Sequence, residues 1–321
     1  MDLDSLSILF IWTTIAIYAG AFVAYAFDLA RRSEVSADAR FERESALVGA
    51  GASGAPTVQD AKTPAKPRYV MARIGTTLTV IAFLLHLGAT VMRGIAAERV
   101  PWANLYEFAM TGTLLIVFVY LLVLTRVDLR FLGTLITGLV VILMGTAGLS
   151  FYVGVVPLPD ALKSVWLVIH VFVASLATAF FALAFGLSVL QLLQSRRERR
   201  LAEKAEKPGL KFMSTLPGAE KLEGMAFRFA IVGFIFWTFT LIAGAIWAQD
   251  AWGRYWGFDV KETWTFIVWV LYAGYIHARA TRGWRGNPSA WLSIVGFSAV
   301  IFNFTIVNVF FKGLHAYSGL S

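Results

Sequence analysis

Cysteine is absent from all 321 residues of the sequence. Its absence excludes a disulfide framework, a metal site with cysteine ligands and a thiol nucleophile supplied by the chain. Charged residues are also scarce, at 15% of the chain against 58% for hydrophobic residues. Soluble domains carry about 25% charged residues, so this composition predicts an integral membrane protein.

The apolar runs lack the alternation of polar and apolar residues that strands of a membrane barrel would need. Each run is about 20 residues long, which is the length that an α-helix needs to cross the bilayer core. We therefore expect an all-α, polytopic helix bundle with about eight transmembrane helices. The expected spans are Leu6–Phe27, Ile74–Ala96, Leu105–Leu124, Phe131–Val153, Val165–Leu193, Phe227–Trp247, Trp264–Ala278 and Ala290–Phe311.

Two polar segments interrupt this pattern. Residues 33–66 are rich in glycine, alanine and serine, and predict a disordered cytoplasmic linker. The basic connection at residues 196–221 predicts a segment that is partly helical and lies on the membrane surface. The chain thus divides into residues 1–73, with the first span and the linker, and residues 74–321, the main membrane domain. The acidic start, Met-Asp-Leu-Asp, is unlike a signal peptide, so the first span is expected to be retained.

Lysine and arginine are distributed unevenly between the two sides of the expected bundle. Of the 28 basic residues, 22 flank the connections after the first, third, fifth and seventh spans, and 6 lie on the other side. Positively charged loops stay in the cytoplasm, so both termini and the loop at residues 250–264 are expected on the outer face. The net charge of +8 is explained by this topology, and nucleic-acid binding is not needed to account for it.

Aromatic and charged residues are concentrated in one short connection, from Trp252 to Trp264. Its sequence, WGRYWGFDVKETW, places five aromatic and four charged residues between two apolar runs. Several tryptophans on one connecting segment indicate a flat hydrophobic partner that covers them. The alternative is an aromatic belt at the membrane interface, but the glycines and the Asp-Val-Lys-Glu core favour a binding loop.

Two of the four histidines are expected at the height of this loop. His170 lies about five residues into the fifth span, and His315 follows the eighth span. Two imidazoles at one level, beside a tryptophan-lined loop, suit a planar cofactor with two axial ligands, and haem is the obvious candidate. Taken singly, each histidine fits an interfacial or hydrogen-bonded residue better than a metal ligand.

The other two histidines are expected within the membrane. His277 lies near the inner end of the seventh span, and His86 lies near the middle of the second. Ionisable residues in membrane helices are costly and therefore indicate function. His277 is a candidate ligand for a second haem, while His86 is either functional or a packed helix–helix contact. A zinc site fits less well, because the histidines lack the short ligand spacing of zinc motifs.

The loop resembles the tryptophan-rich "WWD" signature of the CcsA/ResC family, which handles haem in cytochrome c maturation. The stretch from Pro101 to Glu107, Pro-Trp-Ala-Asn-Leu-Tyr-Glu, and the ending Gly-Leu-His-Ala-Tyr around His315 are similar to other motifs of that family. The resemblance covers the chain from about Gly75 onward. The sequence departs from it at Phe258, where the family often has tryptophan, and at Val260, where it often has proline.

The resemblance implies roles for particular residues. It implies that His170 and His315 are the two external haem ligands, and that His277 is the membrane-embedded ligand, paired with a histidine of a ResB-type partner. His170, His315 and Asp259 are then the expected catalytic residues. The expected haem-binding residues of the loop are Trp252, Gly253, Trp256, Phe258, Asp259 and Trp264.

The implied function is to bring haem b, as the transported substrate, to the outer face of the plasma membrane and present it to apocytochrome c. There, with the ResB-type partner, the chain promotes thioether attachment to a CxxCH motif, as part of a haem–cytochrome c synthase (lyase) complex. A thiol-reducing system and membrane lipid are the further expected partners. Two alternatives are a membrane electron-transfer protein with bis-histidine haem, and a transporter whose tryptophans form an aromatic cage.

Overall fold

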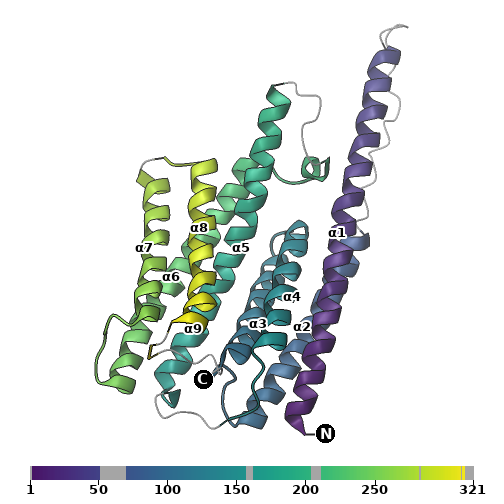
Figure 1. The fold of residues 1–321 in the computed structure, drawn as a ribbon. Helices are drawn as coiled ribbons and strands as arrows, with labels where there is room; N and C mark the ends of the chain where they lie inside the picture. The colour runs from purple at the N-terminus through teal and green to yellow at the C-terminus, as the bar shows by residue number, and fades with distance from the viewer. Residues whose placement is uncertain are drawn as a thin grey trace.

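The computed structural model describes residues 2–50, 70–156, 162–203, 211–281, 283–311 and 313–314, without the side chains of residues 33–50 and 211. Within these ranges the chain forms helices and no strand (Figure 1). The α-helices are α1 (Leu3–Ala50), α2 (Val70–Ala97), α3 (Leu105–Leu124), α4 (Gly133–Ser150), α5 (Val165–Ala202), α6 (Ala219–Trp252), α7 (Val260–Thr281), α8 (Asn287–Phe304) and α9 (Ile306–Phe310). Two short 3-10 helices, η1 (Arg130–Leu132) and η3 (Lys211–Thr215), complete the described elements.

The prediction of an all-α membrane bundle is confirmed. Seven of the described helices are long and apolar enough to cross a bilayer, namely α1 to α6 and α8 with its continuation α9. The remaining predicted span is the seventh, Trp264–Ala278, which corresponds to α7; this helix is 22 residues long and carries Lys261, Glu262 and Arg279 near its ends. It packs against α6 and α8, and therefore forms part of the same bundle.

Several helices extend beyond the apolar spans that the sequence predicts. The first continues to Ala50, so the predicted linker is helical at residues 33–50, while residues 51–69 lie outside the described residues. Alanine, arginine and glutamate are frequent at residues 37–47, and these residues favour a helix even where the chain is polar. The basic connection at residues 196–221 likewise contains the end of α5, the short η3 and the start of α6.

The helices form two groups that meet along one contact. In the first group α1 packs against α2 and α4, and α3 packs against α4 and α2; in the second α5 packs against α6 and α8, and α7 packs against α8 and α6. The main contact between the groups is that of α3 with α5 (Figure 1). This contact brings the first turns of α3 and α5 together at the end of the bundle where the tryptophan-rich loop lies.

Aromatic rings that face glycines hold the second group together. Phe181 of α5 stacks on Tyr272 of α7 with ring centroids 3.6 Å apart. A Cβ atom on Gly233 of α6 would lie 2.7 Å from the Phe181 ring, and one on Gly296 of α8 would lie 2.9 Å from the Tyr272 ring. Small residues at membrane helix interfaces permit such close packing, so these positions fix how α5 to α8 are placed around the site.

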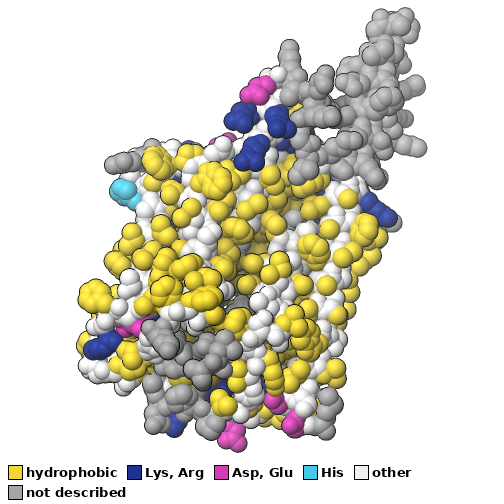
Figure 2. All heavy atoms as spheres, in the orientation of Figure 1, with side chains coloured by type: hydrophobic (Ala, Val, Ile, Leu, Met, Phe, Trp, Pro, Cys, Tyr) yellow, Lys and Arg dark blue, Asp and Glu magenta, His cyan; other side chains and the backbone are white. Residues whose placement is uncertain are grey.

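The surface agrees with a membrane location. Figure 2 shows hydrophobic side chains covering the middle of the bundle, while charged side chains are gathered at its two ends. The largest basic cluster in this view lies at the end where α5 extends beyond the bundle. The last turn of α5 carries Arg199 and Arg200. The start of α1 lies at the opposite end (Figure 1). Which end faces the cytoplasm stays a prediction from the charge distribution.

Candidate functional site

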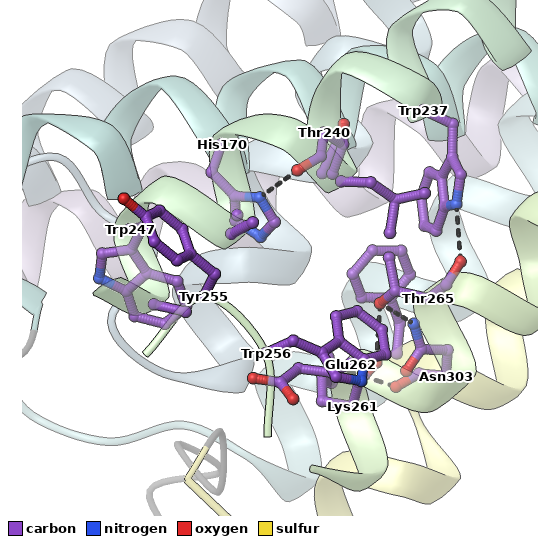
Figure 3. A pocket seen from close by; sticks show the side chains of 16 residues that line it. His170, Trp237, Thr240, Trp247, Tyr255, Trp256, Lys261, Glu262, Thr265 and Asn303 are labelled. Atoms are coloured by element: carbon purple, nitrogen blue, oxygen red, sulfur yellow. Dashed lines mark hydrogen bonds between the residues drawn. The ribbon is translucent and has the colours of Figure 1, made fainter. Parts of the chain in front are cut away.

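A pocket opens where α5, α6, α7 and α8 meet beside the tryptophan-rich loop (Figure 3). It encloses about 620 Å³ of empty space and is lined among others by His170, Trp237, Trp247, Trp256, Lys261 and Asn303. An adjoining pocket of about 660 Å³ shares His170, Trp247 and Lys261 with it and extends to Trp102 and Asn104. We call the two together the outer pocket. Its mainly apolar walls with few polar groups are typical of a small-molecule site.

His170 enters the outer pocket from α5 with a fixed orientation. Its Nδ1 lies 2.9 Å from the backbone oxygen of Thr240 on α6. Because a carbonyl oxygen only accepts, Nδ1 carries the hydrogen and Nε2 carries the lone pair that metal coordination requires. The imidazole also lies nearly parallel to the Trp247 indole, with the ring centroids 5.9 Å apart and 25° between the planes.

Gly244 makes this orientation possible. A Cβ atom at this position would lie 2.7 Å from Cε1 and 2.8 Å from Nδ1 of His170. Real side chains do not approach so closely, so any larger residue would displace the imidazole from the Thr240 carbonyl. The close approach of α5 and α6 at this point thus depends on a glycine in the middle of a membrane helix.

The tryptophan-rich loop begins with a glycine C-cap and contains one strained residue. Gly253 ends α6 in the left-handed conformation, with φ +70°, and donates its N–H to Gln249. Phe258 has φ +56°, which is unfavourable for a bulky residue. Glu262 Oε2 accepts the N–H groups of Gly257 and Asp259, at 2.9 and 3.0 Å, and so holds the backbone on both sides of Phe258.

Asp259 joins the loop to the end of the chain. Its Oδ2 accepts the backbone N–H of Lys261 at 3.2 Å, and its Oδ1 accepts that of Leu314 at 3.0 Å. A Cβ atom on Gly313 would collide with Oδ1, so a glycine is needed where the two segments meet. The last described residues are therefore fixed against the start of α7.

Lys261 brings a cation to the outer pocket. Its Nζ donates to the backbone oxygen of Asn303 at 3.0 Å and lies 5.0 Å from the centre of the Phe304 ring. Arg254 is placed differently: its guanidinium lies 3.9 Å from Glu262 and covers Gly257, where an added Cβ would overlap it. Lys261 is thus the basic residue that faces the pocket, while Arg254 braces the loop.

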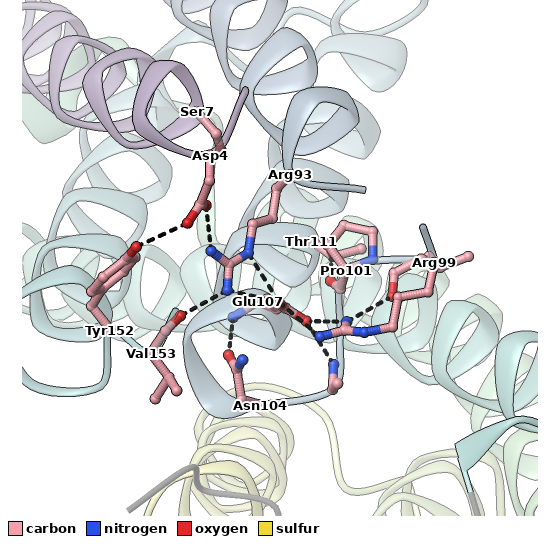
Figure 4. A network of polar contacts seen from close by, with 12 residues as sticks. Asp4, Ser7, Arg93, Arg99, Pro101, Asn104, Glu107, Thr111, Tyr152 and Val153 are labelled. Carbon is pink, nitrogen blue, oxygen red and sulfur yellow. Dashed lines mark hydrogen bonds and ion pairs between the residues drawn. The ribbon is translucent and has the colours of Figure 1, made fainter. Parts of the chain in front are cut away.

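A buried ion-pair network supports the wall formed by Trp102 and Asn104 (Figure 4). Asn104 caps α3 by accepting the Glu107 N–H at 2.9 Å. The carboxylate of Glu107, which is fully buried, accepts from Arg93 at 3.0 Å, from Arg99 at 2.6 Å and from the N–H of Ala103 at 2.9 Å. The stretch that resembles a family motif in the sequence is therefore held rigidly next to the pocket.

The same network reaches the start of α1. Arg93 donates to Asp4 at 2.5 Å and to the backbone oxygen of Val153 at 2.7 Å. Tyr152 donates to the other oxygen of Asp4 at 3.2 Å, and burial, together with the charge of Asp4, raises the pKa of this tyrosine. The outer ends of α1, α2, α3 and α4 are thereby connected through two buried charges.

The predicted aromatic residues of the loop do not all face the pocket. Trp256 lines it and is partly exposed. Trp252 contacts Trp247, with ring centroids 4.8 Å apart, and Trp264 packs on Phe302 at 4.4 Å. Phe258 is 81% exposed and is not among the residues that line the pocket. The described indoles that line the pocket come mainly from elsewhere: Trp102, Trp237 and Trp247.

The structure separates the predicted histidines. His277 is exposed on α7, 16 residues beyond Lys261 and thus about 24 Å away along the helix, so it cannot share a metal with His170. His86 is fully buried, lies edge-on to Tyr18 with ring centroids 6.1 Å apart, and neither ring nitrogen has a hydrogen-bond partner among the described residues. His315 lies outside the described residues.

Some residues of the site escape sequence analysis. Thr240, Gly244 and Asn303 act through their backbones or by being small, and Trp247 and Phe304 come from within apolar spans. Nothing in their local sequence distinguishes them from residues that only pack. The one available signal is a glycine among bulky residues of a membrane helix, which indicates close approach of a neighbour.

The fold and the site define a class: a multi-pass helical membrane protein with an imidazole set in an aromatic pocket at one end of the bundle. A family model described as "Cytochrome C assembly protein" matches residues 102–315, which include the whole outer pocket. The chain belongs to this cytochrome c assembly family, and it acts in cytochrome c maturation.

Relatives named "Cytochrome c biogenesis protein CcsA" are similar over most of the chain. The protein of Heterosigma akashiwo (strain NIES-293 / 8280G21-1) is 34% identical over 69% of this chain and 77% of its own length. That of Trieres chinensis is 30% identical over 78% and 88%, and that of Chlamydomonas reinhardtii is 32% identical over 86% and 76%.

Among solved structures, a chain titled "Cytochrome c Heme Lyase CcmF" matches 95% of this chain with a TM-score of 0.59 and 16% identity. The match covers 47% of that longer chain. At this level of identity the likeness concerns the fold alone. The arrangement of helices is therefore shared with a protein about twice as long.

Proposed function

We propose that the outer pocket holds haem between His170 and His315 at the outer face of the plasma membrane and presents it to apocytochrome c. With a ResB-type partner, the chain then promotes thioether bonds to the two cysteines of a CxxCH motif. The observation that carries this proposal is the imidazole of His170, oriented by the Thr240 carbonyl within a pocket lined by indoles. Haem b is the substrate carried, rather than a permanent cofactor.

The donor set fits an iron porphyrin. A neutral imidazole with Nδ1 bonded to a backbone carbonyl is the usual form of a histidine ligand, because the hydrogen bond fixes the tautomer and the ring plane. Flat aromatic side chains offer contact area to a macrocycle at little entropic cost. His170 has both features, since it lies beside Trp247 at the wall shared by the two parts of the outer pocket.

The second ligand is proposed from the tie between Asp259 and the end of the chain. Leu314, whose N–H bonds to Asp259, immediately precedes His315 in the sequence. The described chain thus ends beside the loop, one residue before the proposed ligand. In this proposal Asp259 positions the segment that carries His315, and Trp256 of the loop helps to cover the macrocycle.

Lys261 is the proposed partner of a haem propionate. Among the described residues it is the cation that lines both parts of the outer pocket, and its Nζ donates to a neutral backbone oxygen. A carboxylate would form a charge-assisted bond with it, which is stronger than the bond to a neutral carbonyl. This contact would hold one edge of the porphyrin at the polar rim and leave the opposite edge for reaction.

The chemistry of attachment belongs to the substrates. Each cysteine thiol adds across one vinyl group, so that sulfur bonds to one carbon and hydrogen to the other, and no oxidant is consumed. The chain supplies position, because holding haem at a fixed site converts a bimolecular encounter into a local one. The histidine of the CxxCH motif then replaces one of the two imidazoles on the iron, which releases the product.

His277 has a separate role in this proposal. It lies exposed at the far end of α7, where a histidine of the ResB-type partner could complete a second pair of axial ligands within the membrane. An exposed position on the bundle surface suits a ligand shared with another chain. Haem would pass from that site to the outer pocket.

A test is to replace His170 with glycine in the complex purified with its partner and to add haem. We expect haem affinity to fall at least tenfold and the reduced-minus-oxidised spectrum of the outer site to disappear, because one axial ligand is missing. Added imidazole should restore both. His277→Gly is the matched control, since it removes a histidine at the other end of α7 and should leave the outer-site spectrum of haem-loaded protein unchanged.

The proposal fails if the His170→Gly complex binds added haem with wild-type affinity and spectrum in the absence of imidazole. It also fails if haem attachment to a CxxCH peptide continues at the wild-type rate under the same conditions. Either result would mean that the oriented imidazole does not serve the iron.

A further inference from the structure

The two oxygens of the Glu262 carboxylate differ in their contacts. Oε2 accepts the N–H groups of Gly257 and Asp259, at 2.9 and 3.0 Å, and these bonds fix the orientation of the carboxylate. Oε1 is buried and has no hydrogen-bond partner among the described residues, although Glu262 lines the outer pocket. Buried polar atoms are almost always satisfied, so this oxygen points to a group that the bare chain does not supply.

A second buried acceptor in the outer pocket is also unpaired. Asn303 is 1% exposed and its Nδ2 donates to Thr265 Oγ1 at 3.2 Å, but its Oδ1 has no partner in the part of the chain that the structure describes. A ligand that satisfies both acceptors has to donate hydrogen. The ionised propionates of haem only accept, whereas a peptide with a CxxCH motif brings N–H and S–H groups. The unpaired atoms thus fit the peptide and not haem alone.

The attachment reaction needs a group that handles one proton. When a cysteine adds to a vinyl group, the S–H bond breaks, one vinyl carbon bonds to sulfur, and the other carbon gains a hydrogen. The thiolate is the nucleophile, and a free cysteine, with a pKa of about 8.5, is mostly protonated at neutral pH. A positioned base that removes the proton accelerates such a step by about 10²–10⁴-fold.

Glu262 is the one carboxylate among the described residues that line the outer pocket. In the proposed function His170 binds iron and Lys261 binds a propionate, so neither is available as the base. Asp259, the other acidic residue of the loop, uses its oxygens for backbone N–H groups and lines neither part of the pocket. The free oxygen of Glu262 is therefore the best placed acceptor for a proton.

Arg254 is the partly exposed neighbour of this carboxylate. Its Nη1 lies 3.9 Å from Oε2 of Glu262, which is too far for a hydrogen bond, and has no hydrogen-bond partner among the described residues. The Arg254 side chain is 35% exposed, whereas that of Glu262 is 8% exposed. Arg254 can therefore turn away from Glu262 without breaking a hydrogen bond of Nη1, and this movement would give a ligand access to the carboxylate.

We propose that Oε1 of Glu262 takes the proton from a cysteine thiol of the CxxCH motif and returns it to the vinyl carbon that does not bond to sulfur. This inference rests on the proposed function, because it assumes that haem and the peptide meet in the outer pocket. The S–H bond breaks, one C–S bond and one C–H bond form, and the carboxylate is regenerated without an oxidant or a reductant. Oε2 keeps its two N–H bonds, so the base stays in place.

Glu262→Gln in the complex purified with its partner tests this role. The amide oxygen can still accept the N–H groups of Gly257 and Asp259, while the NH₂ group in place of Oε1 cannot take up a proton. We expect haem to bind within about twofold of the wild-type affinity, and the single-turnover rate of attachment to a CxxCH peptide at neutral pH to fall by about 100-fold or more. Glu220→Gln is the control, since Glu220 is exposed in the first turn of α6 and its replacement should change neither quantity.

A reduced peptide with selenocysteine in place of both cysteines separates proton transfer from damage to the loop. A selenol is more acidic than a thiol and is ionised at neutral pH, so it needs no base to become a nucleophile. The hydrogen on carbon then comes from water in both proteins. With saturating haem, we expect wild type and Glu262→Gln to attach this peptide at rates within about threefold of each other, against the 100-fold difference with cysteine.

Three results would overturn the role of Glu262 as the base. The first is attachment of the cysteine peptide by Glu262→Gln at the wild-type rate. The second is an equal slowing of both peptides, and the third is a loss of haem affinity, since each would show that the carboxylate only supports the loop. The first two leave the haem site untouched, because the spectrum of His170→Gly tests that site on its own.

Discussion

Gly244 has no side chain, and this absence leaves the space in which the imidazole of His170 lies. The ring of His170 occupies the space that a Cβ atom would take, and in that place it bonds to the Thr240 carbonyl. The hydrogen-bonding partner of a metal ligand sets the ring plane and the basicity of the coordinating nitrogen. The function proposed for His170 therefore depends on Gly244, a residue without a functional side chain.

We expect Gly244→Ala to weaken haem binding by about 10–100-fold, which is the usual effect of losing the partner of a metal-ligating histidine. The alanine would push the imidazole away from Thr240 without removing it. The measurement is a haem titration of purified protein followed by absorbance. Gly224→Ala is the control on the same helix, because a Cβ atom there meets nothing within 4 Å. Equal affinities for the two variants would contradict this account of Gly244.

His170 can be singled out from the sequence, but the residues around it cannot, and the reason is physical. A histidine in a membrane helix is costly and is therefore noticed at once. Thr240 and Gly244 act through a carbonyl and through missing atoms, and neither effect is visible until α5 is packed on α6. The loop shows the converse case, because its tryptophans are conspicuous in the sequence, yet Trp252 and Trp264 pack against neighbouring aromatic rings.

At the scale of the helices, the Glu107 network is what joins the outer ends of α1, α2 and α3. It contains two carboxylates and two guanidinium groups, and Arg93 and Glu107 are fully buried. Buried charges of this kind stabilise a structure only while every partner is present. The wall formed by Trp102 and Asn104 rests directly on this network.

We expect Glu107→Gln to lower the free energy of unfolding by about 3–5 kcal/mol, because it leaves buried guanidinium groups without full compensation. Thermal unfolding in detergent, with and without added haem, is the measurement. Asp128→Asn is the control, since the Arg130–Asp128 pair is partly exposed and such pairs contribute at most about 1 kcal/mol. A destabilisation by Glu107→Gln no larger than that of the control would show that the network does not stabilise the contact between these helices.

The sequence predicts the bounds of a helix correctly where the helix is apolar over its full length. The third helix was predicted at Leu105–Leu124 and is found there, because Asn104 caps it and a polar turn follows it. The predicted sixth span began at Phe227, whereas α6 begins at Ala219. Hydropathy detects the part of a helix that faces lipid, and it does not detect the charged turns that continue the helix into water.

At the scale of the whole molecule, the helices alternate in direction, so that the tryptophan-rich loop and the start of α1 lie at one end of the bundle and the basic end of α5 at the other (Figure 1). The fold class follows from the composition and the spans follow from the lengths of the apolar runs, because lipid leaves few choices of structure. The division into two helix groups joined by α3 and α5 did not follow, since it depends on which glycines face which rings.

The orientation of the bundle is open to a direct test with single cysteines, because the chain has none. We expect a membrane-impermeant maleimide to label Phe258→Cys in intact cells, as the loop is predicted to face outward. Arg200→Cys, at the exposed end of α5, should be labelled only after the cells are opened. The reverse pattern would invert the topology and place the outer pocket toward the cytoplasm.

Asp259 accepts one backbone N–H from the start of α7 and another from Leu314, almost at the end of the chain. The carboxylate of Asp259 therefore joins the start of α7 to the segment that contains Gly313 and Leu314. A displacement of Leu314 would break its hydrogen bond to Asp259, and Asp259 also stabilises the first turn of α7 through Lys261. It follows that a displacement of Gly313 and Leu314 would also disturb the start of α7, because both segments depend on the same side chain.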